Sequence, residues 1–330
     1  MAKKERKVNF ANLTIKFGRA DLLDYIEVVS RAFLMASHVR NTKSGSYFFL
    51  KTKIKELEEN NPQSVVIYGR IVKHTKLTRE QVIQGEELVE NVAHIENSPS
   101  AFFVLFLSDH RIAYVPETKY APSLKNFEAA VSLFVKREFK AFSKEIYRAR
   151  KSEDAGFTWG KFYEEHVPPT VNVVPLASPQ GVKAFISKFD SINRITVHLL
   201  ERNQDSEGRS IFEQLLDDTT PMNPTSAKYE VRAGGEGLKI ENTKEFVSDA
   251  THGGYERVSI EGKDHTGAKL VGSNDTYKMS VATKLSDVDS TRARQLRQLY
   301  EDQKERGNIK VGPRDEGFIS NAISKIWGNV

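Results

Sequence analysis

The sequence predicts an α+β fold in which helices pack against a mainly antiparallel sheet, followed by a C-terminal domain rich in β-hairpins. Residues 101–107 are apolar without a break, and after a polar turn residues 112–115 form a second apolar run, which is typical of a buried hairpin. From Asn126 the apolar residues recur at helical spacing. Between residues 229 and 285, short alternating runs are separated by Gly pairs and Asn or Asp, as in hairpins with one solvated face.

The segments before the central hairpin supply further strands and helices. Residues 8–17 alternate and predict a strand, and residues 21–35 then place apolar side chains at helical spacing. Residues 47–54 and 65–72 predict two strands that a polar loop joins as antiparallel partners. Residues 78–92 predict a short amphipathic helix that leads into the hairpin.

The segments after the long helix alternate in the same way. Residues 157–166 are rich in aromatic side chains and predict a helix, and residues 170–176 predict an extended segment. Ser178 followed by Pro179 is a typical helix start, and residues 195–200 predict the next strand. A short helix is expected at residues 211–216.

The C-terminal third begins with short strands and ends with two helices. The expected strands are residues 229–232, 238–241, 257–261, 269–271 and 277–283. Asp and Ser at residues 287–290 are expected to cap a helix over residues 291–306. Residues 317–327 place their apolar side chains, ending in Trp327, on one helical side, so this last helix should dock on its own domain or on a second copy.

This order of elements predicts two domains. We expect an α+β domain over residues 1–205, which includes the basic helix at 126–151, and a linker over residues 206–228. Residues 229–330 would then form the β-rich domain with its C-terminal helices. A chain of 330 residues is long enough for two such domains.

Composition excludes several classes of protein. The 49 Lys and Arg against 44 Asp and Glu give a net charge of +5, which is compatible with a polyanionic partner without requiring one. There is no cysteine, which excludes disulfides, thiolate catalysis and Cys-based zinc sites. No signal-peptide pattern and no apolar run of eighteen residues is present, so we expect a cytoplasmic protein.

The helix predicted at residues 126–151 has a strongly cationic face. It carries seven Lys and Arg against three Glu, a net charge of 7 − 3 = +4. Most of the cations form a row at four-residue spacing, Lys136, Lys140, Lys144 and Arg148, with Arg137 and Lys151 beside it. The row is either a solvated face that pairs with Glu128, Glu138 and Glu145, or a surface that binds the phosphates of a nucleic acid. Arg292, Arg294 and Arg297, at the start of the helix at 291–306, would form a second cationic patch.

Most catalytic motifs are missing. The eight His residues are scattered without the spacing of metal ligands on one helix turn or strand. The Gly-rich stretch at residues 234–237 lacks the preceding buried strand and the following Lys-Ser or Lys-Thr of a nucleotide-binding loop, and it predicts a hairpin turn. No Ser lies in a nucleophile-elbow pattern. The sequence therefore suggests no cofactor, metal or small-molecule substrate, and it favours a binding protein over an enzyme.

One enzymatic alternative remains open. Glu261 and Lys263 end an alternating run, and Asp249 lies upstream where an adjacent strand could hold it. Asp followed by Glu-x-Lys is similar to the arrangement of restriction-type nucleases, in which carboxylates hold Mg²⁺ and a lysine supports the attacking water. Such short matches also arise by chance, and the alternative interpretation is a solvated hairpin.

The order of strand patterns resembles that of the Rex A family of lambdoid phages and of related bacterial proteins found in anti-phage defence loci. The resemblance covers residues 46–200 in outline and fades beyond residue 229. It is carried by SYFFL at 46–50, SPSAFFV at 98–104, DHRIAY at 109–114, VNVVPL at 171–176 and RITV at 194–197.

The resemblance implies a dimeric α+β protein that binds DNA with little sequence preference. It also implies a sensor in abortive infection, or phage exclusion, that works with a membrane-embedded partner. No catalytic residue comes with the family. We therefore expect a homodimer that binds the backbone of double-stranded DNA. A protein-interaction subunit that binds through the apolar tail around Trp327 is the remaining alternative.

Overall fold

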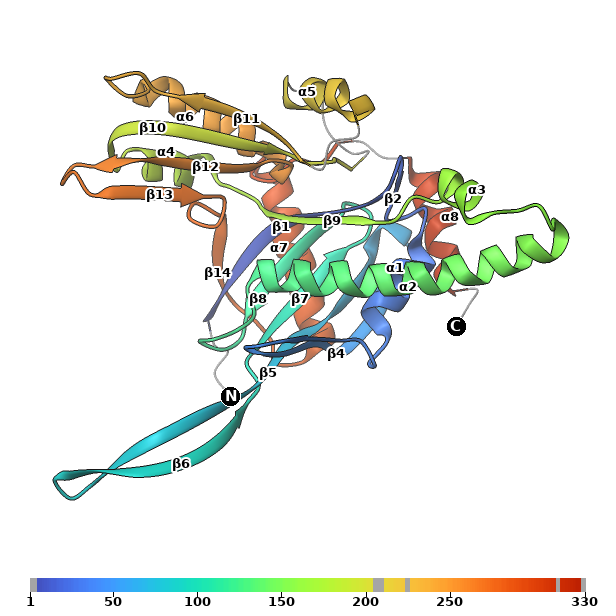
Figure 1. The fold of residues 1–330 in the computed structure, drawn as a ribbon, viewed down its shortest axis with the longest axis horizontal. Coiled ribbons are helices and arrows are strands. Elements are labelled where there is room, and N and C mark those ends of the chain that lie inside the picture. Colours follow the sequence, from blue (N-terminus) through green and yellow to red (C-terminus); the bar gives the residue numbers. More distant parts are fainter. Residues whose placement is uncertain (1–4, 204–210, 223–225, 313–314, 328–330) are drawn as a thin grey trace.

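Two antiparallel sheets and the helices packed on them build the protein, which confirms the α+β fold (Figure 1). The computed structural model describes residues 5–203, 211–222, 226–312 and 315–327. None of the described helices is both long and apolar enough to cross a membrane.

The larger sheet has ten strands and is centred on the predicted hairpin. Its main path runs β14 (Ser280–Lys284), β1 (Glu5–Phe17), β8 (Arg111–Pro116), β7 (Ser100–Phe106), β5 (Val65–Gln84), β4 (Gly45–Glu56) and β3 (Val39–Thr42). Off this path, β2 (Ala20–Asp21) and β9 (Thr170–Pro175) pair with β1, and β6 (Glu87–Asn97) pairs with β5.

The central strands are apolar on both sides because helices cover both faces of this sheet. Phe103 and Leu105 of β7 join a core with α1 (Ile26–Leu34), α2 (Leu124–Glu153) and α8 (Glu316–Trp327). The alternate residues Phe102, Val104 and Phe106 join a second core with α7 (Asp289–Glu305) on the opposite face. The period-2 alternation of a strand thus divides one apolar run between two cores.

The smaller sheet has four strands, and in the described part of the chain helices cover one of its faces. Its order is β11 (Ala227–Arg232), β10 (Phe189–Leu199), β12 (Arg257–Asp264) and β13 (Lys269–Ser273). Three helices share its core, α4 (Pro179–Ile186), α5 (Ile211–Thr219) and α6 (Ile240–Thr251). The remaining described elements are helix α3 (Trp159–Glu165) and three 3₁₀ turns, η1 (Pro62–Ser64), η2 (Thr220–Met222) and η3 (His252–Gly254).

The smaller sheet is an insertion between β9 and β14, two strands of the larger sheet that both pair with β1. Just after β9, Ala177 forms a β-bridge with Lys278, and the Met279 N–H donates to the Leu176 carbonyl at 2.6 Å. The chain thus leaves and re-enters the larger sheet at one point. The predicted division at residues 206–228 does not match this topology, because β10 lies before it and pairs with β11 and β12, whereas β14, α7 and α8 return to the larger sheet.

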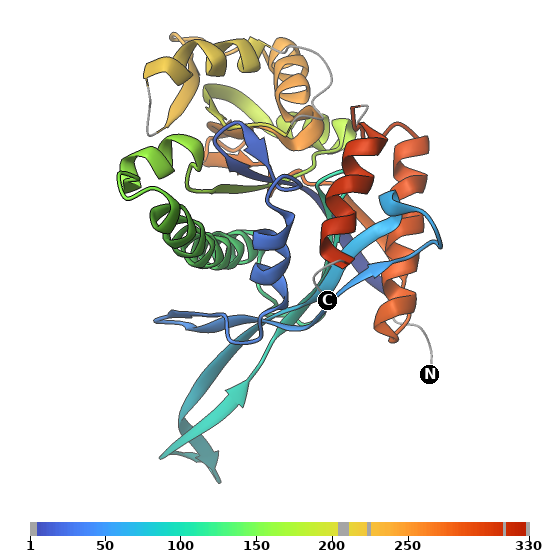
Figure 2. The ribbon, with the colours of Figure 1, turned by 90° about the vertical axis from the view of Figure 1, so that its right-hand side faces the viewer.

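Two predicted elements have the wrong type. Residues 78–92, expected to be a helix, are the ends of β5 and β6, which form a two-stranded arm that projects from the larger sheet (Figures 1 and 2). Residues 238–241, expected to be a strand, contribute one bridge from Leu238 to Ile192 before α6 begins. In both segments the apolar residues fit either period, and tertiary contacts decide between them.

The last helix docks on its own domain. Ile319, Ala322, Ile323 and Ile326 of α8 are buried in the core shared with α1 and the larger sheet. These four residues are therefore occupied within the chain, whereas Phe318 is 40% exposed.

Candidate nucleic-acid interface

Helix α2 carries the predicted cationic row, and its start is set by local sequence. The Ser123 hydroxyl accepts the Asn126 N–H at 3.2 Å, while the Asn126 side chain accepts the Ser123 N–H at 3.1 Å, which completes a capping box. The helix then runs for 30 residues, a length of about 45 Å at 1.5 Å per residue.

One stripe of α2 is buried against the larger sheet. Phe127, Val131, Val135 and Phe139 lie in the core, as their spacing predicts, together with Phe134. Phe142 is partly buried beside them. This packing fixes the rotation of the helix about its axis and determines which residues face solvent.

All six cations that the sequence selects on α2 are exposed. They are Lys136, Arg137, Lys140, Lys144, Arg148 and Lys151. Two of them also hold neighbouring backbone: Arg137 donates to the Val39 carbonyl at 3.0 Å, and Lys151 donates to the Phe157 carbonyl at 2.9 Å. Among the described residues, no carboxylate lies within ion-pairing distance of the other four.

Two of the four glutamates of this helix are engaged away from the row. Glu138 is 9% exposed and forms a 2.8 Å contact with His38 Nε2, under the helix. Glu128 pairs with Arg257 and accepts the Val173 N–H at 3.1 Å, which ties α2 to β12 and β9. Glu145 and Glu153 remain exposed. The structure therefore separates the row from Glu128 and Glu138, two of the carboxylates that could have neutralised it.

A groove runs beside the row, between α2 and the smaller sheet. It has a volume of about 450 Å³ and takes Ser132 and Lys136 from α2, Thr170 and Asn172 from β9, and His198 from β10. Lys136 therefore stands at the edge of a polar groove that reaches the inserted sheet.

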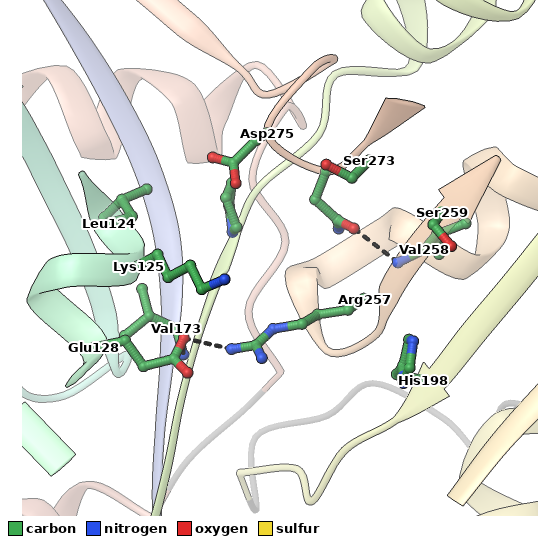
Figure 3. A pocket seen from close by; sticks show the side chains of 12 residues that line it. Leu124, Lys125, Glu128, Val173, His198, Arg257, Val258, Ser259, Ser273 and Asp275 are labelled. Atoms are coloured by element: carbon green, nitrogen blue, oxygen red, sulfur yellow. Dashed lines mark hydrogen bonds and ion pairs between the residues drawn. The ribbon is translucent and has the colours of Figure 1, made fainter. Parts of the chain in front are cut away.

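A smaller cavity of about 230 Å³ lies toward the start of α2 (Figure 3). Lys125 and Arg257 reach into it from opposite sides, and His198 lines it as well as the groove. Glu128 binds the Arg257 guanidinium. Lys125, the other cation that lines this cavity, is exposed and does not share this carboxylate.

An aromatic cluster lies at the other end of the row. The rings of Tyr147 and Trp159 stack with centroids 3.9 Å apart, and Tyr163 stacks on Trp159 at 5.7 Å. Trp159 is 38% exposed and Tyr163 is 45% exposed. In proteins that bind single-stranded nucleic acids, bases stack on exposed aromatic faces of this kind beside cations. The sequence shows the aromatic content of residues 157–166, but only the fold brings these residues to Tyr147.

The second predicted patch does not form as expected. Arg292 is 5% exposed and donates to Glu117 at 2.5 Å and to the Ser286 carbonyl at 2.8 Å. Arg297 is 9% exposed, pairs with Glu301 at 2.8 Å and donates to the Gln63 carbonyl. Of the three arginines, Arg294 is the exposed one. Helix α7 packs on the sheet through Ala293, Leu296 and Tyr300, so that the other two arginines become internal ion-pair partners.

The three residues of the nuclease alternative lie apart. Asp249 is on α6, not on a strand, and α6 packs through Val247 and Ala250 on the face of β12 that carries Val258 and Ile260. Glu261 alternates with Ile260 and therefore points to the opposite face.

Glu261 and Lys263 do lie on one face of β12. However, Arg194 binds Glu261 at 2.7 Å, and this hydrogen bond lowers the pKa of Glu261. No group of three or more His, Asp or Glu that could hold a metal ion occurs in the described ranges. Asp249, Glu261 and Lys263 therefore do not form one metal-binding group in the described part of the chain.

Comparison with protein-family models and with curated protein sequences gave no match to this chain.

Proposed function

We propose that this protein binds double-stranded DNA through its phosphate backbone, with little sequence preference, and that the outer face of α2 is the contact surface. The single observation that carries the proposal is the separation of charge on α2. The six cations selected from the sequence are all exposed along the helix, while Glu128 and Glu138 are bound to Arg257 and His38.

The spacing of the row suits a phosphate backbone. Residues four apart on a helix are about 6 Å apart along its axis, so Lys136, Lys140, Lys144 and Arg148 extend over roughly 18 Å. Over that length duplex DNA carries on the order of ten phosphate charges. Lys and Arg that contact phosphates release condensed counterions, which gives affinity without reading bases.

The wider role in this proposal is that of a cytoplasmic sensor or effector in anti-phage defence, acting with a membrane-embedded partner. Its support is the resemblance in the order of strand patterns over residues 46–200. The protein-interaction alternative is weakened, because Ile319, Ile323 and Ile326 of the terminal helix are buried in its own domain.

The test is a titration of random-sequence duplex DNA with the purified protein over a series of salt concentrations, followed by gel shift or fluorescence anisotropy. The wild type should bind with an affinity that falls steeply as salt rises. The triple variant Lys140→Glu, Lys144→Glu, Arg148→Glu should reduce the slope of log K against log salt by about three units, since each lost phosphate contact removes about 0.9.

A matched control carries the same change in charge at another surface. Lys183→Glu, Lys188→Glu and Arg306→Glu alter three exposed cations on α4, after α4 and after α7. This control should bind DNA with a slope within one unit of the wild type. Equal losses in both triple variants would mean that net charge, not the α2 row, drives binding, and no binding by the wild type at low salt would refute the proposal.

A further inference from the structure

The arm formed by β5 and β6 projects from the larger sheet into solvent (Figures 1 and 2). Residues 75–84 of β5 pair only with β6 in the ladder, over roughly 33 Å at 3.3 Å per residue. None of the eleven residues of β6 is buried. A two-stranded ribbon of this kind is marginally stable in water unless another layer packs on it.

Large apolar side chains are exposed along this arm. Ile83 and Leu88 face each other near the tip and are 76% and 69% exposed. Val92 and Ile95, nearer the base, are 59% and 54% exposed. Apolar residues concentrated on a projecting element mark a surface that a partner covers.

Charge is unevenly divided along the arm. The half nearer the base, residues 73–79 of β5 and 91–97 of β6, contains three cations, Lys73, Lys76 and Arg79, and one carboxylate, Glu96, which lies opposite Lys76. Residues 80–90, which form the tip, contain four Glu and no Lys or Arg. The β3–β4 turn adds exposed Lys43 at the base, since Ser46 of β4 pairs with His74.

This polarity identifies the partner. Four glutamates at the tip repel a nucleic acid, so the covering surface must be cationic beside the tip, anionic beside the base and apolar in between and along the arm. A second arm that runs in the opposite direction meets this requirement, because a two-fold axis places the same patch on both partners and sets each tip against the other base.

We propose that two copies of this chain pair through antiparallel β5–β6 arms, so that Glu86, Glu87 and Glu90 of one copy lie against Lys43, Lys73 and Lys76 of the other. Pairing covers Ile83, Leu88, Val92 and Ile95 in both copies. This inference does not depend on DNA binding, and its test uses no DNA.

A charge exchange between two variants tests the proposal. The tip variant is Glu86→Lys, Glu87→Lys, Glu90→Lys, and the base variant is Lys43→Glu, Lys73→Glu, Lys76→Glu. Molar mass is measured by light scattering after size exclusion, at several protein concentrations and at low salt. The wild type should have the mass of a dimer, and each variant alone should have the mass of a monomer, because like charges then meet at both ends.

The mixture of the two variants distinguishes pairing of the arms from a general effect of the altered net charge. In an equimolar mixture, the cationic tip of one variant meets the anionic base of the other at both contacts, so the dimer mass should return. The Lys183→Glu, Lys188→Glu, Arg306→Glu protein should remain dimeric. Thermal unfolding followed by circular dichroism verifies that each variant is folded.

Three outcomes would overturn the proposal. They are a monomeric wild type at every concentration, a dimer that survives both charge reversals, and folded variants whose mixture stays monomeric. If a variant does not fold, the test is instead a salt series on the wild-type protein. The dimer should then dissociate more readily as the salt concentration rises, and a dimer that does not respond to salt contradicts the charge pairing.

Discussion

At the scale of single residues, the surroundings of an arginine decide whether it is a binding or a structural group. Arg292 and Arg70 converge on Glu117, whose two oxygens accept hydrogen bonds at 2.5 Å and 2.9 Å, and Ser100 adds a third at 2.7 Å. Arg70 also binds Asp289 through two contacts of 2.7 Å. Burial alone would raise the pKa of Glu117, but these hydrogen bonds and the Arg70 charge outweigh it and hold that pKa below its usual 4.5.

The Glu117→Gln variant should lower the free energy of unfolding at neutral pH by about 1–3 kcal/mol, because two arginines lose a buried charged acceptor. A carboxyl whose pKa is depressed by folding stabilises the protein above its unfolded pKa, and this contribution is lost as pH falls through the folded pKa. The difference from the wild type should therefore shrink as pH falls below 4.5. Urea unfolding at a series of pH values measures it.

Glu145→Gln, an exposed change on α2, is the control and should leave stability nearly unchanged. A loss in Glu117→Gln that stays constant down to acid pH would contradict the ionised pair. DNA affinity should not fall in the Glu117→Gln variant, since Glu117 and Arg292 do not lie on α2.

At the scale of elements, the close approach of β10 and β12 explains why β12 contains a glycine. Gly262 lies between Glu261 and Lys263, where an isolated sequence suggests a turn. In the structure it faces the irregular stretch of β10, and a Cβ at this position would lie 2.1 Å from the Ser191 carbonyl oxygen. The glycine is therefore required by close approach of two backbones and not by a turn.

Gly262→Ala should destabilise the smaller sheet by about 1–3 kcal/mol, because the obstacle is backbone that cannot rotate away. Gly235→Ala is the matched control, since a Cβ there meets nothing within 4 Å. Urea unfolding followed by circular dichroism compares them. Equal stability of the two variants would show that β10 can shift without cost.

At the scale of the whole molecule, the inserted sheet and the larger sheet have separate cores but share a polar junction. Asn12 of β1 donates to the Gly254 carbonyl at 3.2 Å, and fully buried Arg111 donates to the Tyr255 hydroxyl at 3.2 Å. Glu128 and Arg257 join α2 to β12 at the same junction. The insertion therefore covers charged groups of the larger sheet without sharing its apolar core.

Removing residues 178–277 and joining the ends with a short glycine linker should leave a protein that still folds, because Ala177 and Lys278 are already bridged. It should be less stable than the full chain, since Arg111 loses the Tyr255 hydroxyl. Circular dichroism and urea unfolding test folding, and the DNA titration tests α2. A cooperatively folded variant without DNA binding would assign the contacts to the inserted sheet instead.

The sequence by itself determined the features that depend on local pattern. The hairpin of β7 and β8, helix α2 with its Ser123 cap, and the exposed row from Lys136 to Arg148 follow from apolar period and capping, which act within a few residues. The α+β fold class followed from the same periods.

Only the tertiary structure decided which elements pair over long distances. In the structure, residues 78–92 belong to the β5–β6 arm, and Arg292 and Arg297 of α7 are buried. Glu138 of α2 is also buried and contacts His38. The tertiary structure also placed β10 beside β11 and β12, which begin at residues 227 and 257 whereas β10 ends at residue 199, and it returned β14 to β1. The physical reason is that such choices depend on contacts between distant segments, whose partners a local hydrophobic period does not specify.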